Sequence, residues 1–327
     1  MSVFRVLVTG DNLAPAAVSI LKDIGAEVVL MPGTITPERI AAEMAGAPTQ
    51  AVLMRGNPVI SADVIAGNPH LRVIAKHGAG IDSVDVEAAT RRRVPVMVAG
   101  DANAPAVAEH TIALILALGR DIVSLDARTR AGAWERPTYR GREVRGRTLG
   151  LIGFGRIARH VARTATALGM TVMALGRDKG RIDPALAREA KDLDELLAVS
   201  DIVSLHAPLT EATRGIINAE RIAAMKPGAI LINTARGALV DEDALRAALE
   251  SGHLAGAGLD TLAEEPPAKD RPILQAPNLI VTPHISAQTG AAITRMGVEA
   301  ARNIAAVLTQ GDIDRANVVN PAALDPP

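Results

Sequence analysis

A glycine-rich segment is the part of this sequence whose residue types and spacing most directly indicate chemistry. Gly-x-Gly-x-x-Ala, ending at Ala158, follows a short apolar run and precedes a helical one. In a strand–turn–helix unit the first glycine permits a tight turn, the second lets backbone approach a pyrophosphate, and the alanine allows close helix packing. The helix N-terminus then offers unpaired N–H groups to phosphate oxygens. Without these flanks the motif could be any glycine-rich turn. The dinucleotide-binding residues predicted here are Gly153, Phe154, Gly155, Arg156 and Ile157.

The end of the next predicted strand, at 171–175, favours a phosphorylated cofactor. NAD enzymes usually place an acidic residue there, roughly 20 residues after the loop, where it binds the ribose 2′-hydroxyl. This sequence has Gly176 followed by Arg177 at that point. Glycine leaves room for a 2′-phosphate and arginine can pair with it. We therefore predict a preference for NADP(H); NAD(H) is the alternative if Asp178 turns back to the ribose and Arg177 is solvated.

The elements that must position these residues alternate between short β-branched runs and alanine-rich helical segments. This pattern is typical of βαβ units and parallel sheets, with room for one crossover helix between strands. A long helix is predicted at 104–119 and another at 287–309, and the tail 320–327 is expected to be frayed. The predicted strands form one series at 4–9, 27–31, 51–54, 71–75 and 95–98, and a second at 148–153, 171–175, 201–205, 229–233, 255–259 and 279–283.

Two series of strands predict two domains. We expect an α/β protein with two Rossmann-like domains built on parallel sheets. A dinucleotide-binding domain at 101–286 is inserted into a flavodoxin-like substrate-binding, or lid, domain formed by 1–100 and 287–327. Closure of the two domains about the helix at 104–119 would exclude water from the reaction.

Ordered motifs extend along most of the chain. They are Gly78-Ala-Gly80-Ile-Asp82, Val107-Ala-Glu-His-Thr, Gly153-Phe-Gly155-Arg-Ile, His206-Ala-Pro-Leu-Thr, the segment from Met225 to Arg236-Gly, Ala257-Gly-Leu-Asp260, Glu264-Glu265-Pro266 and Thr282-Pro-His284-Ile-Ser. The kind, order and spacing of these motifs, from about Val52 to Ser286, resemble those of the D-isomer-specific 2-hydroxyacid dehydrogenases. Within that family it is similar to the phosphoglycerate dehydrogenases and the hydroxypyruvate and glyoxylate reductases.

The resemblance implies that Arg236, Glu265 and His284 form a catalytic set, and their positions agree. Each follows a predicted strand, and open α/β sheets form their crevice at the carboxyl ends of the strands. The Arg236 guanidinium suits the carboxylate and carbonyl of a 2-keto acid. His284 is the expected general acid in reduction and base in oxidation, and a bond from Glu265 would favour the protonated ring. The neighbouring Glu264 is the rival for that role.

The remaining site predictions concern substrate and cofactor contacts. The backbone N–H groups of Ala79 and Gly80 are expected to bind the substrate carboxylate. Arg55 and Lys76 follow first-domain strands and could bind a second anionic group, or they could be ordinary surface charges. Asp260 resembles the family residue that contacts the nicotinamide carboxamide. Other positions resemble cofactor-lining segments: His206, Ala207, Pro208, Thr213, Thr234, Ala235 and Ser286.

Composition excludes several classes of partner and chemistry. Lys+Arg 35 against Asp+Glu 36 gives a net charge of -1, so no overall field attracts nucleic acid or an anionic membrane. Zero cysteines exclude disulfides and thiol nucleophiles, and 1% aromatic residues leave little for base stacking. No His/Asp/Glu spacing indicates a metal site. The first residues read as a strand instead of a secretion signal, and the apolar stretch 104–118 is shorter than the ~20 residues of a membrane span. We expect a cytoplasmic protein that forms a homodimer, the latter from the resemblance and the apolar helix at 104–119.

The predicted activity is hydride transfer between the nicotinamide cofactor and C2 of a small 2-keto or 2-hydroxy acid. Glyoxylate, hydroxypyruvate, phosphohydroxypyruvate and other 3-substituted pyruvates or lactates all remain open. Alternatives are a non-catalytic dinucleotide-sensing module that binds proteins, and a phosphoglycerate dehydrogenase without a regulatory domain. A formate dehydrogenase-like enzyme would require a neutral residue in place of Glu265 and a longer chain.

Overall fold

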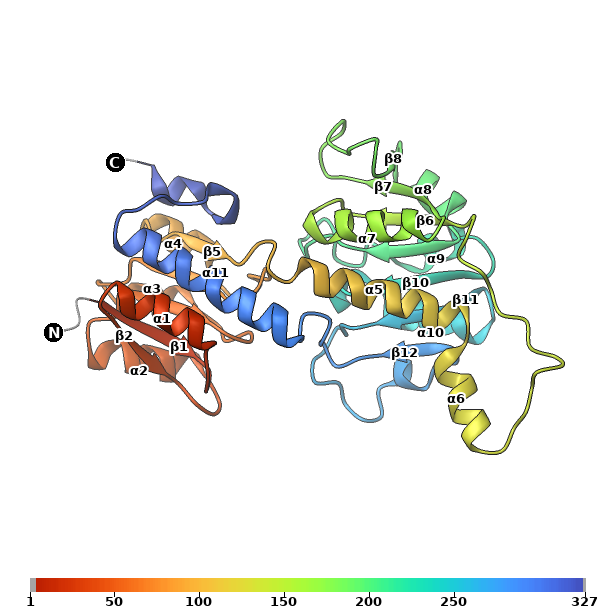
Figure 1. Ribbon diagram of the computed structural model, residues 1–327, viewed down its shortest axis with the longest axis horizontal. Helices are drawn as coiled ribbons and strands as arrows, with labels where there is room; N and C mark the ends of the chain where they lie inside the picture. The colour runs from red at the N-terminus through yellow and green to blue at the C-terminus, as the bar shows by residue number, and fades with distance from the viewer. Residues whose placement is uncertain (1–3, 326–327) are drawn as a thin grey trace. The chain divides into compact units, whose positions relative to one another are not determined.

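The computed structural model describes residues 4–325, and the chain divides into two compact units (Figure 1). Unit 1 comprises Met1–Asn103 and Gln288–Pro327, and unit 2 comprises Ala104–Ala287. The sequence placed these divisions at 100/101 and 286/287. Predictions that involve residues 1–3 and 326–327 lie outside the described part of the chain.

Unit 1 is built on a parallel five-stranded sheet. Its order, β2-β1-β3-β4-β5, is the flavodoxin-like order that the sequence predicted. The strands are β1 (Phe4–Thr9), β2 (Ala26–Leu30), β3 (Ala51–Met54), β4 (Val73–Lys76) and β5 (Val96–Val98). The helices are α1 (Pro15–Asp23), α2 (Pro37–Gly46), α3 (Ala62–Ala66), α4 (Val86–Arg91) and α11 (Gly290–Leu308).

Helices cover both faces of this sheet because its strands are apolar on both sides. Every residue of β3 and β4 is buried, as expected for a parallel sheet packed between two helical layers. Val6 and Leu53 pack with α1 and α11 on one face, whereas Leu7 and Val52 pack with α2, α3 and α4 on the other.

The C-terminal segment is ordered by unit 1, so the predicted fraying of 320–327 is wrong for its described part. Two 3-10 helices, η3 (Arg315–Asn317) and η4 (Pro321–Leu324), follow α11. The buried Asn320 side chain accepts a bond from Val96 N at 2.7 Å and donates to Val94 O at 3.0 Å. These backbone partners satisfy the amide and fix the tail beside β5.

Unit 2 contains a parallel seven-stranded sheet in the order β12-β11-β10-β9-β6-β7-β8. From β8 to β11 this is the 3-2-1-4-5-6 order of a dinucleotide-binding sheet, and β12 adds a strand at one edge. The strands are β6 (Thr148–Ile152), β7 (Thr171–Leu175), β8 (Arg188–Glu189), β9 (Ile202–Leu205), β10 (Ala229–Asn233), β11 (Leu254–Leu259) and β12 (Leu279–Val281). The sequence did not predict β8, because its two charged residues carry no apolar pattern.

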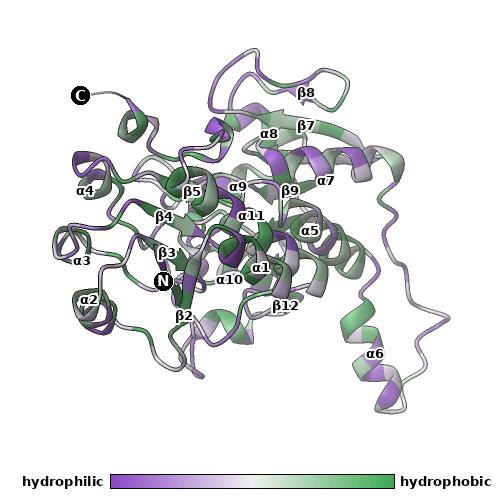
Figure 2. Cartoon of the chain, turned by 60° about the vertical axis from the view of Figure 1, so that its left-hand side comes forward, coloured by the Kyte–Doolittle hydropathy of each residue, from purple (hydrophilic) through white to green (hydrophobic). Residues whose placement is uncertain are grey.

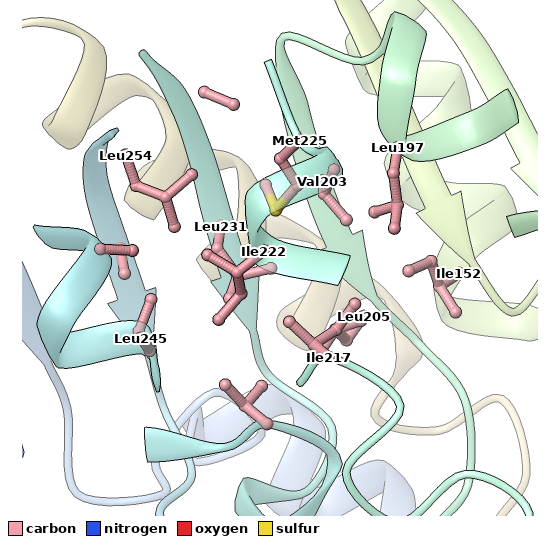
Figure 3. Packing of buried hydrophobic residues seen from close by; sticks show 14 of the residues in the cluster. Ile152, Leu197, Val203, Leu205, Ile217, Ile222, Met225, Leu231, Leu245 and Leu254 are labelled. Atoms are coloured by element: carbon pink, nitrogen blue, oxygen red, sulfur yellow. The ribbon is translucent and has the colours of Figure 1, made fainter. Parts of the chain in front are cut away.

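Alternating side chains from these strands enter two apolar layers. Val203 and Leu205 pack against α8 (Leu193–Val199), α9 (Ala219–Ala224) and α10 (Glu242–Glu250) in the layer shown in Figure 3. Leu149 and Leu151 pack on the opposite face, against α5 (Ala104–Gly119) and α7 (Arg156–Ala167). This period of two fixes the strand register, and with it the loops at the carboxyl ends.

One helix of unit 2 lies away from its sheet. In both views α6 (Ile122–Arg130) and the segment after it extend outward from the rest of the unit (Figures 1 and 2). None of the α6 residues is buried, and Ile122, Val123 and Trp134 are exposed. A helix without a buried face gives no core periodicity, which is why the sequence did not predict it.

Residues 4–325 contain neither a membrane-spanning helix nor a metal-binding cluster. Within that range, no helix has the length and apolar character needed to cross a membrane. Over the same residues, no three His, Asp or Glu side chains are grouped so that they could hold a metal ion.

Candidate active site

Three neighbouring strands of unit 2 end in the loops that carry the predicted catalytic residues. Arg236 follows β10, Glu265 follows β11 and His284 follows β12. β11 pairs in parallel with β10 on one side and β12 on the other, so the three loops leave the same edge of the sheet. Residues as far as 48 positions apart in sequence are thereby carried on three neighbouring strands.

Glu265 and His284 are hydrogen-bonded. The Nδ1 atom of His284 lies 2.7 Å from Glu265 Oε2, and Glu265 Oε1 accepts a bond from Leu262 N at 3.0 Å. The side chains are 37% and 35% exposed, for His284 and Glu265 respectively, so the imidazole can be reached from solvent. The bond occupies Nδ1 and leaves Nε2 as the nitrogen that can exchange a proton with a ligand.

The structure also separates the two adjacent glutamates. Glu264 Oε2 accepts a bond from Arg271 Nη1 at 2.8 Å, and its side chain is 63% exposed. Glu264 is therefore engaged by a surface cation, whereas Glu265 faces the imidazole.

A buried carboxylate fixes the loop that carries His284. Asp260, fully buried at the end of β11, accepts bonds at Oδ1 from Thr282 Oγ1 at 2.5 Å and from Ile285 N at 2.9 Å. Its Oδ2 accepts a third from Ser286 N at 2.8 Å. These donors compensate the burial of the charge and surround His284, whose φ of 54° is in the left-handed region.

A second polar side chain fixes the Arg236 loop. Asn233, buried at the end of β10, donates through Nδ2 to Arg236 O at 2.8 Å and accepts at Oδ1 from Ala235 N at 3.0 Å. The Arg236 side chain itself donates from Nη1 to Ala235 O at 2.7 Å. Main-chain geometry at the arginine is therefore set before any ligand binds.

Gly237 brings the Arg236 loop against the Glu265 loop. A Cβ placed on Gly237 would lie 1.9 Å from Leu262 C and 2.2 Å from Ala263 N. Any side chain here would collide with backbone, so the glycine is required by this close approach. The cation and the carboxylate consequently come from loops in direct contact.

The predicted dinucleotide turn has the expected geometry. Gly153 has φ 93°, and its Cβ would lie 2.6 Å from His206 O, so both conformation and space require glycine. Gly155 is the N-cap of α7, and a Cβ there would meet nothing within 4 Å. Ala158 is fully buried in the α5–α7 layer. The open space over Gly155 and the N–H groups of α7 fit a pyrophosphate.

The end of β7 has room for a substituent on the ribose. A Cβ at Gly176 would make only ordinary contacts, the nearest at 3.5 Å to Asp178 O. The Arg177 side chain is 93% exposed and lies 3.7 Å from Asp178 Oδ1. An exposed ion pair at that separation is weak, so it would not prevent Arg177 from binding a phosphate.

Several side chains predicted to line the cofactor stabilise loops. The His206 ring lies 2.9 Å from Ser204 Oγ, and burial lowers the pKa of His206 to about 4. Thr213 Oγ1 donates to Pro208 O at 2.7 Å, and Thr234 Oγ1 lies 3.0 Å from Thr111 Oγ1. Their contacts with a cofactor, and those predicted for Ala207, Ala235, Asp260 and Ser286, stay predictions.

Unit 1 carries the predicted substrate-binding loop. Gly78 has φ 140° after β4, and Ala79 is exposed beside the half-exposed Gly80. Lys76 is buried and donates through Nζ to Gly56 O and, at 2.9 Å, to Asn57 Oδ1. Lys76 thus stabilises the loop that follows Arg55.

The Arg55 guanidinium donates to the carbonyl and side-chain oxygens of Asn12. The neighbouring His77, which the sequence did not single out, is largely shielded from solvent. Burial, and then the cations of Arg55 and Lys76, lowers the pKa of His77 to about 4. Substrate contacts of Arg55 and Lys76 stay predictions.

Sequence reasoning did not find the residues that fix the site. Asn233 and Thr282 bond to loops, while Glu242 at the start of α10 accepts from Arg271 Nε at 2.7 Å. Contacts between residues 29 positions apart, such as Glu242 with Arg271, leave no local pattern.

Comparisons with known proteins agree with this geometry. The family described as "D-isomer specific 2-hydroxyacid dehydrogenase, NAD binding domain" matches residues 112–286. Hydroxypyruvate reductase of Thermotoga maritima is 42% identical over 255 residues, which cover 77% of this chain and 83% of that protein. D-3-phosphoglycerate dehydrogenase of Mycobacterium tuberculosis is 40% identical over 303 residues, or 91% of this chain and 56% of that protein. This chain thus spans about half the length of such phosphoglycerate dehydrogenases.

A similar solved structure is that of an acyclic imino acid reductase in complex with NADPH and D-Arg. It is 28% identical, with a TM-score of 0.87, and the match covers 97% of this chain and 100% of that one. The chain belongs to the D-isomer-specific 2-hydroxyacid dehydrogenase family, which confirms the resemblance drawn from its motifs.

The close approach at Gly237 predicts that a methyl group added there destabilises the fold. Gly237→Ala should lower the free energy of unfolding by about 1–3 kcal/mol, because the added atom must displace the backbone of the Glu265 loop. Chemical denaturation measures the change. Gly290→Ala, where a Cβ meets nothing within 4 Å, is the matched control and should change stability far less. Equal stability of the two variants would contradict the close approach.

The neutral His206 ring predicts a dependence of stability on pH. Because the folded-state pKa of about 4 lies below the unfolded value of about 6.5, the unfolded chain binds the proton first. The stabilisation is present above pH 6.5 and is lost as pH falls toward 4. The unfolding free energy of the wild type should fall between pH 6.5 and pH 4, and that of His206→Gln should fall by about 1–2 kcal/mol less. This difference is smaller than a fully buried ring would give. The exposed His70→Gln is the control; identical pH curves for both variants would refute the shift.

Proposed function

We propose that this protein is an NADPH-dependent oxidoreductase that transfers a hydride between the cofactor and C2 of a small 2-keto or 2-hydroxy acid. The observation that carries the proposal is the 2.7 Å bond between Glu265 and His284, which follow β11 and β12 in the sheet where β10, paired with β11, precedes Arg236. A cation, an imidazole and its carboxylate are the groups that reduction of an anionic ketone requires. The proposal is supported by the family match, because the matched residues 112–286 include all three side chains.

Each of the three side chains has a distinct role in reduction. The Arg236 guanidinium binds the carboxylate and carbonyl oxygens of the keto acid and polarises the carbonyl. His284, through Nε2, donates a proton to the oxygen as negative charge develops there, and in oxidation it removes that proton. Glu265 orients the ring through its bond to Nδ1. The turn at Gly153 and Gly155 would hold the pyrophosphate of the cofactor, whose nicotinamide would supply or accept the hydride.

The substrate we propose is small and anionic. In unit 1 the backbone turn at Ala79 and Gly80 binds its carboxylate, and the cations of Arg55 and Lys76, which lower the pKa of the neighbouring His77, favour a second anionic substituent at C3. Hydroxypyruvate, glyoxylate and 3-phospho- or 3-sulfo-substituted pyruvates are the compounds to compare. Intact Arg236, Glu265 and His284 support an enzyme over a dinucleotide-sensing module.

Turnover and its dependence on Arg236 test this assignment. We expect oxidation of NADPH with at least one of these keto acids, and a fall in kcat/KM of about 100-fold or more in Arg236→Lys, because lysine cannot form the bidentate pair. Absorbance at the reduced-nicotinamide band measures both. Arg315→Lys, an exposed arginine of unit 1, should be unchanged. NADPH binding without turnover of any member of the panel would favour the sensing module.

NADP(H) preference is supported by the room at Gly176 and the exposed Arg177, with NAD(H) as the weaker cofactor. Gly176→Asp should lower kcat/KM for NADPH by about tenfold or more and spare NADH, because a carboxylate repels the 2′-phosphate and can bind the 2′-hydroxyl. A Cβ at this position makes only ordinary contacts. Steady-state kinetics with both cofactors decide. A wild-type preference for NADH that is lost in Asp178→Asn would show that Asp178 serves the ribose instead.

A homodimer formed through α6 and the segment after it is part of the proposal. The support is the exposure of Ile122 and Val123 on a helix that buries none of its own residues, together with that of Trp134 in the segment after it. Ile122→Asp combined with Val123→Asp should convert a dimer to a monomer, as measured by light scattering after gel filtration. Val59→Asp, an exposed apolar residue of unit 1, is the control. A double variant that stays dimeric would place the interface elsewhere.

A further inference from the structure

Glu242 is an acidic residue whose side chain does not serve its own helix. Asp241 is the N-cap of α10 and accepts bonds from Asp243 N at 3.1 Å and Ala244 N at 3.0 Å. The Glu242 side chain is only 10% exposed. It accepts bonds from Ala263 N at Oε1 and from Arg271 Nε at Oε2, each at 2.7 Å. A buried carboxylate with these two partners has a purpose beyond the helix dipole.

The two partners of Glu242 lie on either side of Glu265. Ala263 precedes Glu265 in the loop after β11, and Arg271 follows it, just before η2 (Pro272–Gln275). One carboxylate therefore joins both arms of the loop to α10. Arg271 also bonds Glu264 Oε2 at 2.8 Å, so its guanidinium is held at two points.

This arrangement sets the backbone that orients Glu265. Leu262 N, next to the bonded Ala263, donates to Glu265 Oε1 at 3.0 Å, and Oε2 is left for His284. A half-exposed pair such as Glu265–His284 gains little free energy from attraction alone, because solvent screens it and both side chains lose rotamer freedom. It forms reliably only if the loop already presents the carboxylate.

We propose that Glu242, acting with Arg271, is a positioning residue for the reaction: it holds the Glu265 loop so that the carboxylate stays bonded to His284 Nδ1 and orients the ring. This rests on the proposed function for its catalytic meaning, but the contact itself can be tested without substrate. Other titratable groups around the His284 loop are Asp260 beneath it, His110 of α5, 3.0 Å from Thr282 Oγ1, and Arg236 on the β10 loop. The variants below leave these three groups unchanged.

The test measures the titration midpoint of the His284 ring by NMR on the full chain labelled at histidine. The His284 signal is assigned as the one that is missing in His284→Asn. Removing an adjacent negative charge disfavours the protonated ring, so Glu265→Gln should lower the midpoint. Glu242→Gln, which keeps its size but cannot accept from both donors, should give at least half of that shift. In the double variant Glu242→Gln/Glu265→Gln the shift should equal that of Glu265→Gln alone, because both changes act through one pair.

Glu264→Gln is the matched control, since it removes the exposed contact of Arg271 and keeps both bonds of Glu242. It should leave the midpoint where it is in the wild type. Arg271→Lys, which keeps the charge, should give a smaller shift than Glu242→Gln and serves as the test if that variant fails to fold by circular dichroism. A wild-type midpoint in Glu242→Gln, or additive shifts in the double variant, would overturn the proposal.

The readouts separate the two claims. In kinetics, Glu242→Gln should lower the pH at which reduction is lost and reduce kcat above neutral pH with little change in KM. The expected NMR shifts without turnover of any keto acid would refute the proposed function and leave the positioning role intact. No midpoint shift in Glu265→Gln would refute the pair, and with it the role of Glu242.

Discussion

A short hydrogen bond between a carboxylate and an imidazole, each about one-third exposed, is the interaction on which the site depends. Glu265 and His284 lie 2.7 Å apart although 19 residues separate them. The bond needs two adjacent parallel strands to end at the same level, and β11 and β12 are paired in that way. The apolar layers on the two sheet faces thus act on catalysis through strand register.

Buried polar side chains, the anchors of the site, bond to the loops after these strands and so fix how the loops present their side chains. Asp260 accepts three hydrogen bonds from the His284 loop. Asn233 accepts a bond from Ala235 N and donates one to Arg236 O. Each anchor is a buried group that would be costly if left unpaired, so the loops it bonds are held in one arrangement. Gly237 then allows the Arg236 and Glu265 loops to touch. Such preorganisation lets a site bind charge that develops during reaction without rearranging.

Periodic features of the sequence predicted the fold better than they predicted the supports of the site. Parallel order, the dinucleotide turn at Gly153 and the positions of Arg236 and His284 follow from apolar runs and motifs. The choice between Glu264 and Glu265 does not, because adjacent residues in a loop carry no periodicity, and only the contact with Arg271 separates them. β8 and α6 were missed since neither has an apolar face. The tail at Asn320 was misjudged because its bonds are to distant backbone.

The central claim is that Glu265, through its bond to Nδ1, orients His284 for proton exchange with the substrate oxygen. It is tested most directly by the pH profile of kcat/KM for reduction of the best keto acid by wild type and Glu265→Gln. Loss of the carboxylate should move the alkaline limb to lower pH, while Glu264→Gln should retain the wild-type profile. Superimposable profiles for wild type and Glu265→Gln would contradict the account.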